Sequence, residues 1–133
     1  MAWEQPSMCS GSLTAAADLS AKQYHIVKKN TTNNQVAICT AAGEMFFGVL
    51  QNKPASGESA EVMLVGVTKV TADETLTAGD LWGTSADGQA QKIEASATGA
   101  DIRAYFGGQV IEGAAAGELA TVTIGVQTGQ VSA

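Results

Sequence analysis

The chain has 133 residues, of which 45% are hydrophobic and only 15% are charged, and its formal net charge is −6. This length predicts a single domain that buries a modest core without disulfides or metal. An acidic chain lacks the basic field on which non-specific binding to DNA or RNA depends, so we expect no nucleic-acid partner. No apolar run is long enough to span a bilayer, so we expect no membrane contact either.

The N-terminus and the cysteines indicate where the protein is made. The N-terminus lacks a basic segment followed by an apolar one, so we expect no secretory signal. Cys9 and Cys39 are too few for a disulfide framework, and free thiols are the default in a reducing compartment. These features favour assembly in a cytoplasm.

The charges are few and unevenly spread. Residues 1–70 balance five acids against five lysines, whereas residues 71–133 carry eight acids against Lys92 and Arg103. This asymmetry indicates either one end that docks and one that stays solvated, or chance. The low charge content suits a surface that neighbours partly cover, a β protein with many tight turns, or both.

Residues 1–20 predict an N-terminal arm, because Trp3, Met8 and Leu13 are isolated apolar residues in a stretch without an apolar period. One interpretation is a flexible tail. The other is an extended segment that lies along a partner and buries Trp3 there. Helical signal is weak throughout, and the alanine-rich residues 13–21 could form one short turn of helix.

From residue 23 onward the pattern favours short strands separated by polar or glycine-containing turns. Residues 45–50 are apolar on both faces, which predicts a central strand, and Asp87-Gly88 is a hairpin signal. The glycine pair at 107–108 predicts a bulge or bend. The predicted strands are 24–28, 35–39, 45–50, 61–70, 80–83, 89–93, 103–111 and 119–126. The fold class is therefore all-β, a small β-sandwich or β-barrel-like domain over residues 21–133 with an extended N-terminal arm.

One pattern, Gly-Glu-x-Ala-x-Val, occurs twice, beginning at Gly57 and at Gly117. In each copy the glycine supplies a tight turn and the glutamate marks a solvated strand start. Alternation then places three apolar residues of each copy on one face: Ala60, Val62 and Leu64, and Ala120, Val122 and Ile124. We expect two equivalent strands that pack on a shared core; coincidence in a chain of small residues is the rival interpretation.

Three segments together carry a family resemblance. Residues 48–62 join Gly-Val-Leu to a Pro-Ala-Ser-Gly turn and a strand, and residues 76–82 read Leu-Thr-Ala-Gly-Asp-Leu-Trp before Asp87-Gly88. Residues 108–118 read Gly-Gln-Val-Ile-Glu-Gly-Ala-Ala-Ala-Gly-Glu and lead to a further strand. In composition and spacing these segments resemble the small capsid decoration, or cement, proteins of tailed bacteriophages, which have a β-rich core.

The resemblance implies a structural virion protein, assembled in the host cytoplasm, that binds the outer surface of the capsid. Homotrimers or other oligomers would reinforce contacts between major capsid protein subunits. An oligomer is also expected because the apolar run at residues 62–70 is a hazard as an exposed edge. The alternative is another virion or surface adhesion module, such as a tail, fibre or carbohydrate-binding β domain. We expect the capsid contacts at the apolar anchors of the arm and the lysines that follow it: Trp3, Met8, Leu13, Lys22, Lys28 and Lys29.

The sequence contains no recognisable catalytic set. His25 is the single histidine and lies in an apolar strand, which predicts a packed or hydrogen-bonded core residue rather than a base. No serine lies in a Gly-x-Ser-x-Gly elbow, and Cys9, Cys39 and His25 lack zinc-ligand spacing. Neither a P-loop nor a Gly-x-Gly-x-x-Gly motif occurs. We therefore expect no enzyme activity, no cofactor and no metal.

Overall fold

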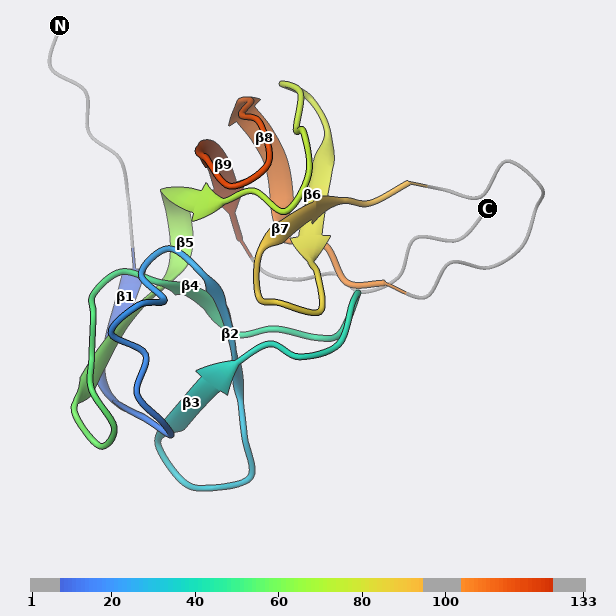
Figure 1. The fold of residues 1–133 in the computed structure, drawn as a ribbon. Helices are drawn as coiled ribbons and strands as arrows, with labels where there is room; N and C mark the ends of the chain where they lie inside the picture. Colours follow the sequence, from blue (N-terminus) through green and yellow to red (C-terminus); the bar gives the residue numbers. More distant parts are fainter. Residues whose placement is uncertain (1–7, 95–103, 126–133) are drawn as a thin grey trace, which may run out of the picture.

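The computed structural model describes the backbone of residues 8–94 and 104–125, and the side chains from residue 13 onward within those ranges. All the regular secondary structure in these ranges is β-strand. The strands join into one nine-stranded sheet, so the all-β prediction is confirmed (Figure 1). These ranges contain no helix long and apolar enough to cross a membrane. The strands are β1 (Met8–Ala15), β2 (Ile26–Lys29), β3 (Gln35–Ile38), β4 (Gly48–Leu50), β5 (Ser59–Thr71), β6 (Leu81–Thr84), β7 (Ala90–Lys92), β8 (Gly108–Glu112) and β9 (Leu119–Ile124).

The first five strands close into a small barrel. β1 pairs in parallel with β3, and β3, β2, β4 and β5 follow in antiparallel order. β5 then pairs with β1 and completes the circle. We call this barrel, residues 8–64, the first unit. Its buried interior consists of Leu13, Ala15, Leu19, Val27, Val36, Leu50, Ala60 and Val62.

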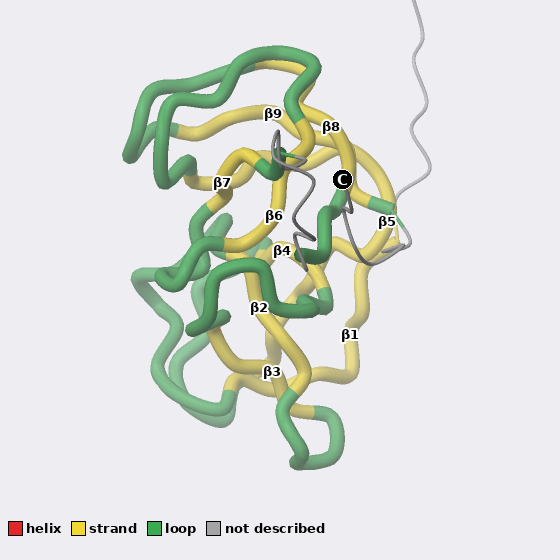
Figure 2. The backbone as a smooth tube through the Cα atoms, turned by 90° about the vertical axis from the view of Figure 1, so that its right-hand side faces the viewer, coloured by secondary structure: helices red, strands yellow, loops and turns green. Residues whose placement is uncertain are grey.

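The C-terminal half of β5 and the last four strands form a second unit, residues 65–125. β5 pairs with β9 from Gly66 to Thr71, and β9, β8, β6 and β7 follow in antiparallel order. A parallel bridge from Ala72 to Ala90 brings β7 back to the end of β5. Figure 2 shows β1, β2 and β3 in the lower part of the view and β7, β8 and β9 in the upper part. From the second unit itself, the corresponding interior contains Val70, Ala72, Leu76, Trp82, Ala90, Val110, Ala120, Val122 and Ile124.

The two units are copies of one strand pattern. Each has the same order of pairing, including one parallel pair, which is β1–β3 in the first unit and the Ala72–Ala90 bridge in the second. The register also agrees, because Leu50 lies opposite Val62 and Val110 lies opposite Val122. The eight interior residues of the first unit correspond, in chain order, to eight of the nine of the second, and Ile124 corresponds to the partly buried Leu64. A duplicated strand pattern, closed into a barrel by strand pairing in the first unit and by one isolated bridge in the second, therefore accounts for nearly the whole described chain.

The repeated Gly-Glu pattern begins the last strand of each unit. Gly57 and Gly117 have φ angles of 80° and 84°, a region that glycine adopts readily. The Gly57 amide donates to the Ala15 carbonyl at 2.9 Å, and the Gly117 amide donates to the Ala72 carbonyl at 2.7 Å. Two equivalent strands are thus confirmed. The expectation of one shared core is wrong, because each copy contributes its buried residues to the interior of its own unit.

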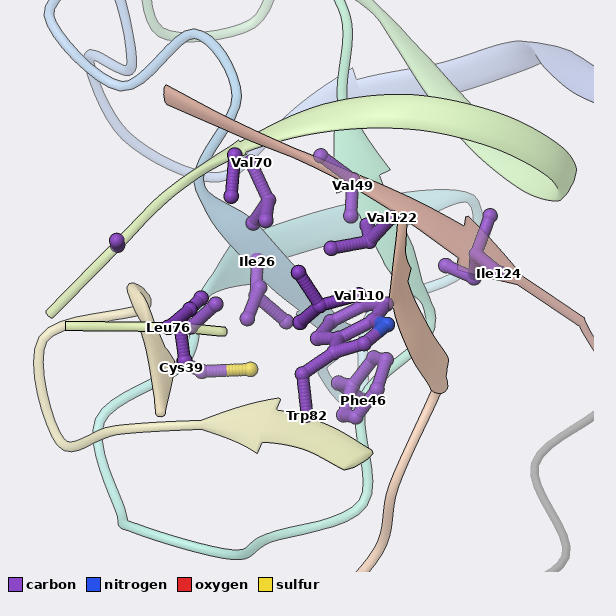
Figure 3. Packing of buried hydrophobic residues seen from close by; sticks show 13 residues of the cluster. Ile26, Cys39, Phe46, Val49, Val70, Leu76, Trp82, Val110, Val122 and Ile124 are labelled. Carbon is purple, nitrogen blue, oxygen red and sulfur yellow. The ribbon is translucent and has the colours of Figure 1, made fainter. Parts of the chain in front are cut away.

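β2 and β4 form the wall between the two interiors. Side chains alternate along a strand, so Val27 and Leu50 face the interior of the first unit. Ile26 and Val49, which lie opposite each other in the ladder, face the second (Figure 3). All three residues of β4 are buried. The prediction of a central strand within residues 45–50 is therefore confirmed for Gly48–Leu50.

Trp82 fills the interior of the second unit and reaches the first (Figure 3). Its ring centroid lies 5.4 Å from that of Phe46, at an interplanar angle of 32°. Its indole Nε1 donates to the Thr123 carbonyl at 2.9 Å. Gly107 makes room for both rings, because a Cβ atom there would lie 2.5 Å from Trp82 Cζ2 and 2.9 Å from Phe46 Cζ.

The N-terminal part differs from the arm expected over residues 1–20. Met8–Ala15 is a barrel strand between β3 and β5, and no helical turn forms at residues 13–21. Register shifts between Met8 and Cys9 and between Ser10 and Leu13 interrupt the ladder. These irregularities remove the alternation by which a strand is recognised from sequence. Residues 1–7 lie outside the described ranges.

We expect Gly107→Ala to lower the free energy of unfolding by about 1–3 kcal/mol, the usual cost of overpacking a core. The added methyl group must displace Trp82 or Phe46. Gly125→Ala is the control, because a Cβ atom there meets no described atom within 4 Å. Urea denaturation of both variants measures the difference. Equal stability of the two would contradict the packing described for Trp82.

Candidate functional site

Exposed apolar side chains gather on the outer face of the second unit. Ile111 on β8 and Leu119 on β9 are 49% and 47% exposed. The register shifts between Val110 and Glu112, and this bulge accompanies the outward exposure of Ile111. Leu119 and Thr121 alternate along β9 and therefore share a face. The face thus combines exposed aliphatic and hydroxyl-bearing side chains with Glu112, which lies opposite Thr121 in the ladder.

An open pocket of about 300 Å³ lies beside Thr121. It is lined by Tyr24, Gln51, Val67, Thr68, Lys69 and Thr121. Lys69 lies opposite Thr121 in the ladder, and its ammonium is 5.8 Å from the centroid of the Tyr24 ring, within cation–π range. Lys69 forms no ion pair within the described ranges. We call the following residues the outer surface: Tyr24, Lys69, Ile111, Leu119 and Thr121.

The backbone holds Tyr24 in an uncommon conformation. Its φ angle is 63°, which is rare for a bulky side chain. The Tyr24 amide donates to the Leu50 carbonyl at 2.7 Å, and the Thr71 amide donates to the Tyr24 carbonyl at 2.9 Å. Beneath the ring, Gln51 Nε2 donates to Thr68 Oγ1 at 2.8 Å. Strained residues that the surroundings hold in place cluster at functional sites, so this fixed ring is a candidate contact group.

A further exposed apolar residue, Met45, lies on a loop that Glu44 organises. Glu44 Oε1 is 3.0 Å from Lys28 Nζ, and Oε2 accepts the amides of Thr40 and Ala41 at 2.7 and 2.6 Å. Burial opposes ionisation of Glu44, but hydrogen bonds from Ala41, Lys28 and Thr40 outweigh it and lower the pKa of the carboxyl. The ordered loop presents Met45 with 64% of its surface exposed.

The apolar residues expected to contact a capsid do not form one surface in the described chain. Trp3 lies outside the described residues, and Met8 is described only by its backbone at the start of β1. Leu13 is 6% exposed and packs in the interior of the first unit. Its side chain supports the barrel and is not available to a partner, because β1 is a closed strand of that barrel and not an arm.

The three lysines expected beside them have separate surroundings. Lys28 pairs with Glu44, whereas Lys29, the next residue of β2, donates to the carbonyls of Thr32 and Gln35. Consecutive residues of a strand point to opposite faces, so the two ammonium groups do not add to one patch. Lys22 is partly exposed in the turn before β2.

Sequence reasoning missed the outer surface, although a signal for part of it exists. Comparing the two units shows Leu119 where the first unit has Ser59, and Ile111 where it has Gln51. When only one of the two units has an apolar residue at an outward-facing position, that part of its surface is expected to serve a purpose that the other unit's surface does not. Tyr24 and Lys69 come from distant segments and carry no such local signal.

The described residues offer little for chemistry. No three of their His, Cys, Asp or Glu side chains are grouped so as to hold a metal ion. His25 is buried and its Nδ1 lies 3.3 Å from the Gln23 carbonyl, which confirms the expected core histidine. Burial, helped by the charge of Lys22, lowers the pKa of His25. Burial raises the pKa of the Cys39 thiol to about 12, so this thiol stays protonated at neutral pH.

We expect the Glu44 network to weaken in acid. A carboxyl whose folded-state pKa is lowered stabilises the fold fully above its ordinary pKa, and this contribution is lost as the pH falls through the lowered value. Glu44→Gln should cost about 1–2 kcal/mol at neutral pH and much less in acid. Glu61→Gln, a change at an exposed glutamate of β5, is the control. Denaturation at a series of pH values measures this, and parallel pH profiles for wild type and Glu44→Gln would refute it.

Comparison with protein families gave no match, and comparison with curated proteins gave none either. Among solved structures, the chain is similar to the head fiber gp8.5 N base of bacteriophage phi29, with a TM-score of 0.62. The two sequences are 19% identical, and the alignment covers 91% of this chain and 94% of that one. At this identity the likeness is one of fold, and it extends over nearly all of both chains.

Proposed function

We propose that this chain is a structural protein of a bacteriophage virion, placed on the outer surface of the head. The observation that carries the proposal is the likeness of fold to a phage head fibre base, which covers 91% of this chain and 94% of that one. The sequence resemblance to capsid decoration proteins favours the same location independently, because it rests on turn and strand motifs and not on the fold.

Within that role we propose the activity of a cement protein, which binds the major capsid protein and reinforces contacts between its subunits. The mechanism is adhesive and assigns no catalytic residue or cofactor. The first unit is a closed barrel with its strand edges paired, so capsid contacts would come from side chains and not from strand pairing to this unit. A charged content of only 15% supports a surface that neighbours partly cover.

We place the shell contact on the outer surface and on residues 1–7. Ile111 and Leu119 offer aliphatic area for burial, and Tyr24 with Lys69 offers a fixed aromatic ring and an ammonium group that no described carboxylate neutralises. Aromatic and well-buried anchors dominate the energy of protein contacts. Trp3, within residues 1–7, adds an anchor of the same kind.

Capsids of the parent phage, assembled without this chain, provide the test. We expect the purified protein to sediment with these capsids and to raise the temperature at which they release DNA. Leu119→Asp should weaken binding at least about tenfold, because it places a charge in the contact. Ser59→Asp is the matched control, since Ser59 holds the same position in the first unit and is exposed there.

Each outcome separates one part of the proposal from another. Binding without a higher release temperature would contradict the cement role and leave a capsid-borne protein of another kind. Failure to bind would overturn the capsid assignment itself. Deletion of residues 1–7 stops short of β1, so the barrel keeps all its strands. If that variant binds capsids as well as the full chain does, residues 1–7 take no part in the contact.

We also propose that the protein is a homotrimer, as the resemblance to decoration proteins implies. Its low charge content and exposed apolar residues support self-association. Light scattering should give the mass of a trimer at micromolar concentration. A stable monomer under the same conditions would contradict this part of the proposal.

A further inference from the structure

The pocket beside Thr121 has the fixed Tyr24 ring as part of its lining. Two backbone hydrogen bonds hold Tyr24, one donated to the Leu50 carbonyl and one received from the Thr71 amide. The Lys69 ammonium lies 5.8 Å from the centroid of the ring, and a cation above an aromatic face is attracted to it. The ring therefore helps to keep the ammonium beside the pocket that both residues line.

Two polar residues of the lining, Gln51 and Thr68, already satisfy each other. Gln51 Nε2 donates to the Val49 carbonyl at 3.0 Å and to Thr68 Oγ1 at 2.8 Å, which uses both of its hydrogens. The Thr68 hydroxyl donates in turn to the Lys69 carbonyl at 3.1 Å. These bonds give the pocket an ordered lining and do not involve the Lys69 ammonium.

The charge that remains in the pocket favours an acidic ligand. Lys69 forms no ion pair with any carboxylate of the described ranges, and this includes Glu112, which lies opposite Thr121 on β8. The ammonium and the Thr121 hydroxyl can both donate hydrogen bonds. A carboxylate is the strongest partner for such a pair, because hydrogen bonds between charged groups are about twice as strong as neutral ones.

An apolar side chain lies at a fixed spacing from the pocket. Leu119 and Thr121 are two residues apart on β9 and share a face, and Leu119 is 47% exposed. Two residues of an extended chain span about 6.6 Å. A partner segment in the extended conformation can therefore place one side chain at the pocket and the side chain two positions away on Leu119.

We propose that the pocket binds an acidic side chain of a partner protein, carried on an extended segment with an aliphatic residue two positions away. The carboxylate would bond to the Lys69 ammonium and the Thr121 hydroxyl, and the aliphatic residue would cover Leu119. Charge complementarity of this kind adds specificity and speeds association. The inference rests on the proposed function, in which the partner is the major capsid protein, and names the chemistry that this partner must offer.

Short peptides observed by NMR test the site without capsids. The probes are N-acetylated, C-amidated Glu-Thr-Leu and the matching Gln-Thr-Leu, titrated into isotope-labelled protein. We expect the acidic peptide to shift the amide signals of Lys69 and Thr121 and to bind at least about tenfold more tightly than the glutamine peptide. Lys69→Met should abolish this preference. Lys53→Met is the matched control and should keep it, because Lys53 is an exposed lysine of the turn before β5.

Changes at Tyr24 and Leu119 test the two other contributions. Tyr24→Leu removes the ring beside the ammonium and should weaken the acidic peptide, whereas Tyr24→Phe keeps the ring and should bind as wild type does. Leu119→Ser removes the aliphatic contact and should weaken both peptides by the same factor. Circular dichroism of each variant verifies that the fold is retained.

The outcomes separate this site from the proposed function. An equal response to the two peptides, or no shift of the two amides up to the solubility limit of the acidic peptide, would overturn the inference. A larger response to free galacturonate than to Glu-Thr-Leu would also overturn it, because an acidic glycan would then be the better ligand. Selective peptide binding by a protein that does not bind capsids would sustain the inference and contradict the proposed partner.

Discussion

The structure depends on one constraint, which is that the wall of β2 and β4 must be apolar on both faces where it separates the two interiors, at Ile26–Val27 and Val49–Leu50. Val27 and Leu50 fill the interior of the first unit, while Ile26 and Val49 fill that of the second. Neither interior survives the loss of this wall, because each would then open to water on one side. β5 adds a second link, since its 13 residues are the last strand of one unit and the first of the other. We therefore expect the two units to unfold together.

The sequence predicted most strands because turns and alternation are local signals. Eight of the nine strands lie at predicted segments, and β1 was missed because its bulges and small polar residues remove the alternation. The duplication was visible only in the Gly-Glu turns. At the other matched positions the two units share burial and strand pairing but not residue type. Trp82 occupies the position that Val27 has in the first unit, and Ala90 occupies that of Val36. The larger Trp82 and the smaller Ala90 together fill an interior similar to the one that Val27 and Val36 fill. Comparing residue identities between the two units does not detect this compensation.

The surface was predicted less well than the fold, because the use of a side chain depends on what folding brings beside it. Leu13 looked like an anchor in an arm and proved to be a core residue. Lys28 looked like a contact for a partner, and its ammonium instead holds Glu44 and the loop that presents Met45. Tyr24 and Lys69 are 45 residues apart and meet only because the Thr71 amide bonds to the Tyr24 carbonyl at the end of β5. Such a surface follows from the register of the sheet, which no local pattern encodes.

Duplication places the two units in different surroundings, so matching positions of the two units have different uses. Ile26 and Val49 of the first unit are buried against the second unit, whereas their counterparts Leu81 and Gln109 are partly exposed and exposed. Ser59 of the first unit has Leu119 as its counterpart, and Leu119 is 47% exposed. Covering a large apolar side chain is favourable by about 1.5–3 kcal/mol, so an exposed leucine at this position favours contact with a partner. One strand pattern, used twice, can therefore bury its own core in both units while only the second unit offers an apolar outer surface.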